Sequence, residues 1–428
     1  MTTALQNVQQ AIEGYYQENP AYKFDASNPI VRLHEPTFGA AETFAATETM
    51  LSTFVTMGKK VKAFEKKYAE VEGFKYALMN NSGSSANLLA IAALCSPLTQ
   101  DGLKAGDEVL VPALSWSTTI WPLLQHGLVP VFIDCDLETL NMDLAQAEAA
   151  ITSKTRAIMP IHTYGNPCDI DTMMDLVNKH NLILIEDSCE TMGGRYKGKA
   201  TGSFGRVGTF STYFSHHITT LEGGICVTED FDLLEVMRVQ RAHGWSREGE
   251  KHAEYVAANP TIDPRFIFVD TGYNLRPTEV QAAMGLIQID KLASINKRRQ
   301  RAAEQYKTRF AQYSNWLHIQ KSTEGAEHVW FGLPIILDES APFELKEITQ
   351  FIQSKNIETR PVIAGNMTRH PVMKGKTWRQ HGELPNADVV MSRGFALPCH
   401  HDVCEDACTY VCDVVDQFMA QYTATAAA

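Results

Sequence analysis

Between residues 75 and 228, short apolar and β-branched runs alternate with segments of helical periodicity. The runs are KYALMN, DEVLVPA, VPVFIDCD, RAIMPIHT, LILIEDS, GTFSTYF and ICVT. Strands that are covered by helices on both faces are apolar almost throughout, so this alternation predicts an α/β fold with a mainly parallel, seven-stranded sheet. Functional residues of such a sheet lie just beyond the carboxyl ends of its strands.

The pattern changes near Leu292. The stretch INKRRQRAAEQYKTRF is charged and amphipathic and predicts a long connecting helix, after which HVWFGLPIIL and LKEITQFIQSKNIETRPV continue with strand and helix patterns. A chain of 428 residues exceeds what one hydrophobic core usually serves. We therefore expect an N-terminal segment (1–40), a large domain (41–291) and a smaller C-terminal α/β domain (292–428).

Charge and composition exclude several classes of partner. The net charge is −12 and no basic run compensates for it, which argues against nucleic acid and against an anionic membrane surface. The N-terminal stretch MTTALQNVQQ lacks the basic start and apolar core of a signal peptide. Because no stretch approaches the roughly 18 apolar residues of a membrane span, we expect a cytoplasmic protein.

The nine cysteines are scattered along the chain, and three of them, Cys404, Cys408 and Cys412, recur every four residues. A metal site is one interpretation of this spacing. The other is core packing, because the cysteines share a helical stripe with Val411 and Phe418 and free cysteine is among the most buried residue types. The spacing is unusual for zinc, so we expect core packing and no metal.

Three motifs place chemistry at predicted strand ends. In NNSGSSANLL, Gly83 permits a tight turn and Ser84 and Ser85 open a helix, which makes a phosphate cradle or an ordinary helix cap. In ILIEDSCE, Asp187 emerges from a strand, where a carboxylate can cap a helix, bind a metal or pair with a pyridinium nitrogen. In VPALSWSTTIW, Trp116 can lie flat on a planar ring or belong to the core.

Phosphate cradle, aromatic ring and strand-end acid, in this order, are the parts that hold pyridoxal phosphate. The motifs GSSAN, EDSCE, FSTYFSHH, EGG and GYNLRPTEVQAA resemble the sugar aminotransferase family named for DegT, DnrJ, EryC1 and StrS, over residues 30 to 428. The resemblance implies pyridoxal-phosphate fold type I and a homodimer with shared active sites. It also implies cofactor-binding roles for Gly83, Ser84, Ser85, Trp116, Asp187, Glu190, Ser211 and Asn274, of which Asn274 reaches the cofactor phosphate of the other subunit.

One position departs from the aminotransferase pattern. His216 stands where the family normally has the lysine that binds the cofactor covalently, and Glu190 stands where it normally has glutamine. Both departures resemble a small branch, the nucleotide-sugar 3-dehydratases. In that branch the histidine is the base that moves protons at the cofactor. His217 is expected to be structural, because neighbours in an extended segment point to opposite sides.

The branch contains two kinds of dehydratase. One carries an iron–sulfur cluster, but residues 230 to 270 hold no cysteine that could bind it. The other takes its electrons from L-glutamate, and FVTMGKKV and RAHGWSR resemble that kind, which acts on GDP-4-keto-6-deoxy-D-mannose in colitose and O-antigen lipopolysaccharide biosynthesis.

The sequence therefore predicts a pyridoxal or pyridoxamine phosphate enzyme that uses L-glutamate, without an iron–sulfur cluster, to remove the C3 hydroxyl of a nucleotide sugar and release ammonia. An aminotransferase that lost its lysine and a non-catalytic nucleotide-sugar binding homologue remain alternatives. A guanidinium matches carboxylate and diphosphate oxygens. The candidate substrate contacts of this type are Arg241, Arg276, Arg360 and Arg369.

Overall fold

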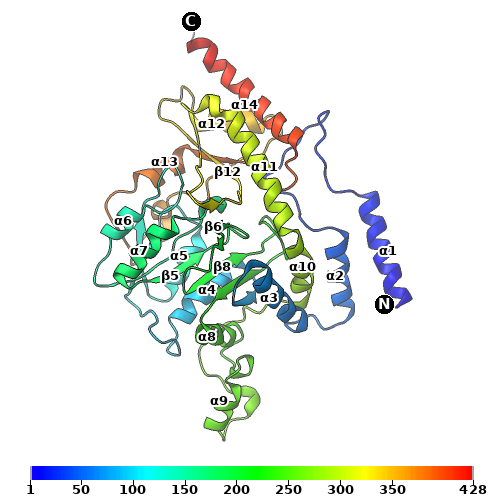
Figure 1. Ribbon diagram of the computed structural model, residues 1–428, viewed down its shortest axis with the longest axis vertical. Coiled ribbons are helices and arrows are strands. Elements are labelled where there is room, and N and C mark those ends of the chain that lie inside the picture. The colour runs from blue at the N-terminus through cyan, green and yellow to red at the C-terminus, as the bar shows by residue number, and fades with distance from the viewer. Residues whose placement is uncertain (1, 427–428) are drawn as a thin grey trace.

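The computed structural model describes residues 2–426, and its centre is an eight-stranded sheet (Figure 1). The strand order is β1-β9-β8-β5-β4-β2-β3-β14, with β9 antiparallel to both neighbours and the other pairs parallel. The strands are β1 (Tyr76–Asn80), β2 (Glu108–Pro112), β3 (Val129–Ile133), β4 (Thr155–Ile158), β5 (Ile183–Asp187), β8 (Val207–Ser211), β9 (Gly224–Thr228) and β14 (Arg379–Gln380).

The predicted α/β fold is confirmed, and each of the seven predicted strands is present. The sheet gains an eighth strand, β14, which comes from the C-terminal part of the chain and pairs with β3. This strand is two polar residues long, so the sequence contains no apolar run from which it could be predicted.

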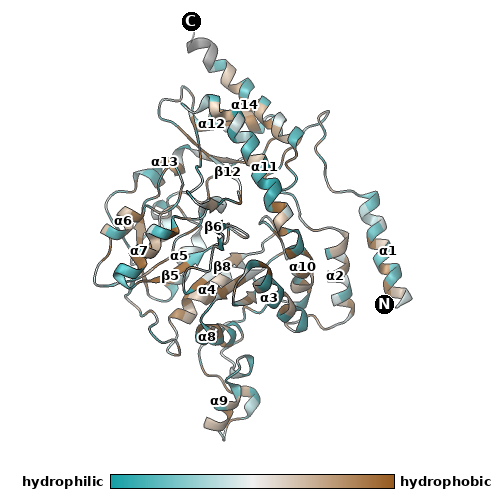
Figure 2. Cartoon of the chain, viewed as in Figure 1, coloured by the Kyte–Doolittle hydropathy of each residue, from teal (hydrophilic) through white to brown (hydrophobic). Residues whose placement is uncertain are grey.

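Helices cover both faces of the large sheet. The helices of this part of the chain are α2 (Ala40–Leu51), α3 (Lys59–Glu72), α4 (Gly83–Leu94), α5 (Ser117–Gln125), α6 (Leu144–Ala149), α7 (Ile170–His180), α8 (Phe231–Arg241), α9 (His252–Ala258) and α10 (Glu279–Gln288). Of these, α9 buries none of its side chains and projects away from the sheet (Figure 1). Helix α4 is apolar on nearly all sides because it lies between the sheet and two other helices, contacting β8, β9, α5 and α8. The core strands and α4 are accordingly among the most hydrophobic parts of the molecule (Figure 2).

A second core forms around a four-stranded antiparallel sheet of order β10-β12-β15-β13. Its strands are β10 (Leu317–Ile319), β12 (Leu333–Leu337), β13 (Arg360–Pro361) and β15 (Gly394–Leu397), and its helices are α11 (Leu292–Phe310), α12 (Leu345–Gln353), α13 (Pro385–Arg393) and α14 (Glu405–Ala426). Helix α11 is the expected connecting helix and runs from the large sheet towards α14 (Figure 1). Cys408 and Cys412 are buried in this second core on the inner face of α14.

Smaller elements complete the chain. A three-stranded antiparallel sheet joins β11 (Ala326–Glu327), β6 (Arg195–Tyr196) and β7 (Lys199–Ala200). Near the N-terminus, α1 (Thr3–Glu18) lies at the side of the molecule against α2 and buries none of its side chains (Figure 1). Within residues 2–426, no helix is both long and apolar enough to cross a membrane.

One buried carboxylate holds the start of α3 in place. Glu279, at the first turn of α10, is 4% exposed and accepts hydrogen bonds from the backbone N–H groups of Gly58 (3.0 Å), Lys60 (2.9 Å) and Val61 (2.9 Å). The first N–H groups of a helix have no partner within the helix, so a carboxylate at this position satisfies them and complements the helix dipole. Residues 54–58 are thereby fixed to α10.

We expect Glu279→Ala to lower the free energy of unfolding by about 2 kcal/mol, because it leaves buried backbone donors without an acceptor. Urea unfolding at fixed protein concentration measures the change. Glu254→Ala removes an exposed glutamate of α9 and serves as the control, with an expected change within about 0.5 kcal/mol. Equal stabilities of the two variants would contradict this role of Glu279.

Candidate active site

A cavity of about 630 Å³ opens where the carboxyl ends of the central strands meet the segment 331–363. It lies at the place that the fold class predicts for function. Eight of the residues singled out in the sequence line it, namely Gly83, Ser84, Trp116, Asp187, Glu190, Ser211, His216 and Arg360. These residues come from five stretches of the chain that lie far apart in the sequence, so the fold brings them together.

One wall of the cavity is the N-terminus of α4. The N-cap is Ser82, whose side chain accepts a hydrogen bond from the backbone N–H of Ser85 (3.1 Å). Ser84 is exposed and its hydroxyl bonds to Thr118 (3.0 Å). A Cβ atom added to Gly83 would lie 2.5 Å from the Cβ of Ser211, so only glycine allows these two segments to approach each other so closely.

This geometry revises the expectation for the serines. Ser82, rather than Ser84 or Ser85, caps the helix, and the Ser85 hydroxyl bonds to that of Ser82 (2.9 Å) instead of lining the cavity. Ser84, the backbone at the start of α4 and Ser211 remain as donors for an anion.

Asp187, the last residue of β5, is 4% exposed and held by three hydrogen bonds. Its Oδ2 accepts from the amide of Asn87 (2.8 Å) and the hydroxyl of Thr119 (2.7 Å), and its Oδ1 accepts from the backbone N–H of Cys189 (3.2 Å). Asn87 is in turn fixed by the hydroxyl of Thr209 (2.6 Å). A buried carboxylate with these donors is oriented towards the cavity as a fixed negative charge.

Glu186, one residue earlier, has a different role. Its carboxylate accepts backbone N–H groups of Gly202 (2.8 Å), Phe204 (2.7 Å) and Gly205 (2.7 Å) and lies 3.2 Å from the Nε2 of His162. It is fully buried on the opposite side of β5 and fixes the loop before β8. Of the two adjacent acids Glu186 and Asp187, only Asp187 lines the cavity.

The segment around His216 is a series of turns rather than an extended strand. The half-buried imidazole of His216 lies 4.9 Å from the ring of Phe331 and 6.0 Å from that of Tyr213, and its Nδ1 has no hydrogen-bond partner among the described residues. Burial, together with the charges of Arg299 and Arg360, lowers the pKa of His216 to about 3. The ring is therefore neutral at physiological pH.

His217 points away from the cavity into the protein. It is fully buried, and its Nε2 lies 3.1 Å from the carbonyl oxygen of Val329. Burial lowers the pKa of His217 well below its usual value, so this ring is also neutral. The contact holds the segment 329–331 against the turn that carries His216.

Glu190 faces the same cavity. Its Oε2 accepts the backbone N–H of Tyr164 (2.7 Å). Burial is the main cause that raises the pKa of Glu190 to about 7, and the hydrogen bond from Tyr164 and the charge of Arg360 oppose it. Arg360, whose guanidinium lies over the rings of Tyr164 (5.9 Å) and Phe331 (5.8 Å), is the cation nearest to this carboxyl in the site.

Three of the four candidate arginines lie elsewhere in this chain. Arg241 is buried and bonds to Glu65 (2.7 Å) and to the carbonyl oxygen of Met79 (2.5 Å), so its charge is already neutralised. Arg369 forms a two-point ion pair with Asp388 on the surface. Their guanidinium groups made them candidates for substrate contacts, and within this chain both are bound to acidic side chains.

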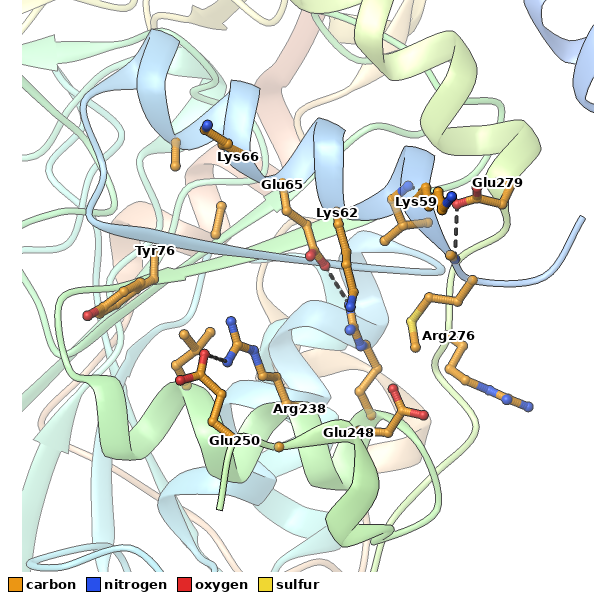
Figure 3. A pocket seen from close by; sticks show the side chains of 18 of the residues that line it. Lys59, Lys62, Glu65, Lys66, Tyr76, Arg238, Glu248, Glu250, Arg276 and Glu279 are labelled. Atoms are coloured by element: carbon orange, nitrogen blue, oxygen red, sulfur yellow. Dashed lines mark hydrogen bonds and ion pairs between the residues drawn. The ribbon is translucent and has the colours of Figure 1, made fainter. Parts of the chain in front are cut away.

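Arg276 and Asn274 also lie outside the cavity, on the loop before α10. The Nε of Arg276 donates to the side-chain oxygen of Asn274 (3.0 Å). Arg276 borders a larger groove of about 1370 Å³ between α3 and α8, in which Lys59 and Lys62 lie opposite Arg238 (Figure 3). Neither Asn274 nor Arg276 reaches its own cavity.

Several residues of the site were missed in the sequence. Asn87 and Thr119 hold Asp187, and Phe331 forms the wall beside His216. Asn87 lies one turn after Gly83 on an otherwise apolar helix, and a polar residue in such a helix could have indicated a functional position. Thr119 and Phe331 carry no comparable local signal.

The chain matches the DegT/DnrJ/EryC1/StrS aminotransferase family over residues 36–416 and belongs to it. Among its relatives, the GDP-4-keto-6-deoxy-D-mannose 3-dehydratase of Yersinia pseudotuberculosis is 40% identical over 372 residues, covering 86% of this chain and 93% of the relative. The protein of the same name from Escherichia coli is 36% identical, covering 90% of this chain and 98% of the relative.

Solved structures agree with these relatives. A crystal structure of GDP-4-keto-6-deoxymannose-3-dehydratase with a trapped PLP–glutamate geminal diamine is similar with a TM-score of 0.84 at 35% identity. The alignment covers 90% of this chain and 99% of that one. The predicted family membership and fold type are thus confirmed.

The raised pKa of Glu190 predicts how pH affects stability. An unfolded glutamate titrates near ~4.3, so the folded state binds the proton more tightly. Native stability therefore falls as the pH rises from about 4.3 to about 7, and levels off above. Glu190→Gln keeps an oxygen that accepts the Tyr164 N–H but does not titrate, so its stability does not fall over this pH range. The free energy of unfolding of the variant minus that of the parent should therefore be higher at pH 8 than at pH 5, by roughly 2–3 kcal/mol.

Urea unfolding of both proteins at the two pH values measures this difference. The surface variant Glu254→Gln is the control and should show the same stability difference at both. A pH-independent difference for Glu190→Gln would mean that Glu190 is already ionised at pH 5.

Proposed function

We propose that the protein is a pyridoxal-phosphate-dependent lyase that removes the C3 hydroxyl of GDP-4-keto-6-deoxy-D-mannose, with L-glutamate as the reductant and ammonia as a product. The observation that carries this proposal is His216, a histidine in the cavity at the family's lysine position, within a site whose other parts are intact. The relatives of that name span nearly the whole chain. We place the reaction in the cytoplasm.

The residues of the cavity fit the cofactor. Gly83 and Ser211 lie too close for any added side chain, which leaves the donors at the start of α4 free for a phosphate. The indole of Trp116 is 55% exposed at the cavity, where it can stack on a planar ring. The buried carboxylate of Asp187 supplies the charge that a pyridinium nitrogen needs.

When bound, pyridoxal phosphate supplies an electron sink that takes two electrons from glutamate and gives them to the sugar as its C3–O bond breaks. His216 accepts and returns the protons that these two half-reactions move, because its neutral imidazole lines the cavity. Arg360 lies at the cavity wall as the fork for a substrate carboxylate.

The absence of a lysine at position 216 also determines how the cofactor is held. Without a lysine, the chain would hold both the aldehyde and the amine form of the cofactor by non-covalent contacts alone. The nearby lysines Lys197 and Lys199 lie outside the cavity, and Lys197 is paired with Asp171. A non-catalytic relative has no use for a carboxylate as firmly held as Asp187, which favours an enzyme.

We further propose a homodimer whose active sites are shared. Large apolar side chains, Trp116, Tyr213 and Leu221, are exposed at and beside the cavity rim, as expected where another protein surface covers them. Asn274 and Arg276 are presented on the surface away from their own cavity. In the dimer, Asn274 contacts the cofactor phosphate of the partner's site.

With GDP-4-keto-6-deoxy-D-mannose and L-glutamate, we expect each sugar deoxygenated at C3 to be accompanied by one 2-oxoglutarate and one ammonia, with no iron and no reductase. The oxygen lost from C3 leaves as water, and the water consumed in releasing ammonia from the nitrogen of glutamate balances it. Mass spectrometry of the sugar and enzymatic assays of the other products measure this stoichiometry.

His216→Asn should bind the cofactor but form neither 2-oxoglutarate nor the deoxygenated sugar above about 1% of the parent rate, since loss of a general base costs about 10²- to 10⁴-fold. An amino sugar that keeps its C3 hydroxyl, formed by the parent enzyme, would instead identify an aminotransferase.

Shared sites predict complementation between two inactive variants. His216→Asn and Asn274→Ala each damage a different half of the same site, so a mixed dimer contains one site with both defects and one intact site. Equal mixing and reassociation should restore about a quarter of the parent activity, as statistical pairing of subunits requires. If the mixture is no more active than the two variants measured separately and added together, a contribution of Asn274 to the partner's site is excluded.

A further inference from the structure

Arg299 is a buried cation whose partners are all uncharged. It lies in α11, is 2% exposed, and donates from Nη1 to the carbonyl oxygens of Trp330 (3.2 Å), Phe331 (3.2 Å) and Cys399 (3.0 Å). In the part of the chain that the structure describes, no ion pair joins it to an acid. Burial lowers the pKa of Arg299 to about 10, so it stays charged.

Burying a charge without an opposite charge costs free energy. The neighbouring arginine, Arg298, avoids this cost. Arg298 points to the surface, is 44% exposed and lies 3.7 Å from Asp402. A buried arginine at the next position therefore requires a specific benefit.

The backbone that Arg299 holds carries the wall of the active site. Trp330 has a left-handed backbone (φ 46°), and the N–H of Phe331 donates to the carbonyl oxygen of Tyr164 (2.8 Å). The ring of Phe331 then lies 4.9 Å from His216 with an interplanar angle of 55°. Since a bulky residue at positive φ is strained, this turn persists only when its surroundings fix it.

We propose that Arg299 is a positioning residue for His216: it fixes the backbone of Trp330 and Phe331 so that the Phe331 ring holds the imidazole in its working orientation. It touches neither substrate nor cofactor, because it does not line the cavity. The inference rests on the proposed role of His216 as the base. His216 needs such support because its Nδ1 has no hydrogen-bond partner to orient the ring.

The charge of Arg299 acts in the same direction as its hydrogen bonds. After burial, it is the first electrostatic cause that lowers the pKa of His216, ahead of Arg360. The other titratable groups around the imidazole are Tyr213, His217, Asp187, Glu190 and Glu222. Arg299 thus helps to keep the imidazole neutral as well as oriented.

Two variants of Arg299 separate positioning from simple filling of space. Arg299→Met keeps an aliphatic side chain of similar length but loses the hydrogen-bond donors. Arg299→Lys keeps a charged donor group, which can bond to several carbonyl oxygens at once, as the single Nη1 does now. The rate at which glutamate converts bound pyridoxal phosphate to pyridoxamine phosphate, followed by absorbance, should fall on the order of 10- to 100-fold in the Met variant. The Lys variant should recover most of this loss, and the half-saturating glutamate concentration should stay the same in both.

A second measurement uses cofactor-free protein and does not depend on activity. In protein with ¹³C-labelled histidine, the His216 signal, assigned by its loss in His216→Asn, should shift in Arg299→Met and return towards the parent position in Arg299→Lys. The control Arg298→Met should leave both the signal and the rate unchanged. An unshifted signal and a parent-like rate in Arg299→Met would overturn the proposal.

If Arg299→Met does not fold, Phe331→Leu tests the same contact without touching Arg299. The proposal requires a shifted His216 signal and a slower glutamate reaction in that variant, and a parent-like result in both would overturn it. If His216→Asn itself converts the cofactor at the parent rate, the proposed base is wrong, and the NMR comparison still decides whether Arg299 positions the ring.

Discussion

The buried carboxylate of Asp187 is the interaction around which the rest of the site is arranged. It ends a central strand, and donors from two different helices, Asn87 of α4 and Thr119 of α5, fix it from the protein side. A charge in this position is tolerable only because these donors are rigid, and they are rigid because α4 is packed on nearly all sides. The apolar character of the strands and of α4 therefore stabilises the fold and also keeps the donors to Asp187 in place.

The site combines a firmly held acid with a loosely bonded base. Asp187 has three hydrogen-bond donors, whereas His216 is oriented by the aromatic rings of Phe331 and Tyr213 and by the turn that carries it. This difference suits the proposed roles of the two groups, because a partner for the cofactor ring has to stay in place whereas a base exchanges protons. Aromatic contacts orient an imidazole without forming hydrogen bonds to its ring nitrogens.

Much of the fold was predictable because the strands are fully buried and the turns between them are marked by glycine and polar residues. The position of Asp187 followed from the same pattern, since the end of an apolar run is visible in the sequence. The helix cap was not predictable among Ser82, Ser84 and Ser85, because each of them could cap a helix that begins at the next residue.

The arginines were harder to place. Arg241 and Arg369 are bound by Glu65 and Asp388, which lie 176 and 19 residues away in the chain. Spacing along the sequence contains no information about such partners. The role of Arg299 was hidden for the same reason, since its acceptors are backbone carbonyl oxygens that no side-chain pattern reveals.

The pairing of β14 with β3 has a consequence for how the protein is made. Strand β3 is complete by residue 133, but its outer edge is covered only when Arg379 and Gln380 have left the ribosome. Throughout the synthesis of the intervening chain, the nascent large domain presents an open strand edge, which is a template for aggregation. A segment translated about 250 residues after β3 thus closes the sheet, and molecules truncated before it would be exposed to mispairing with one another in the cell.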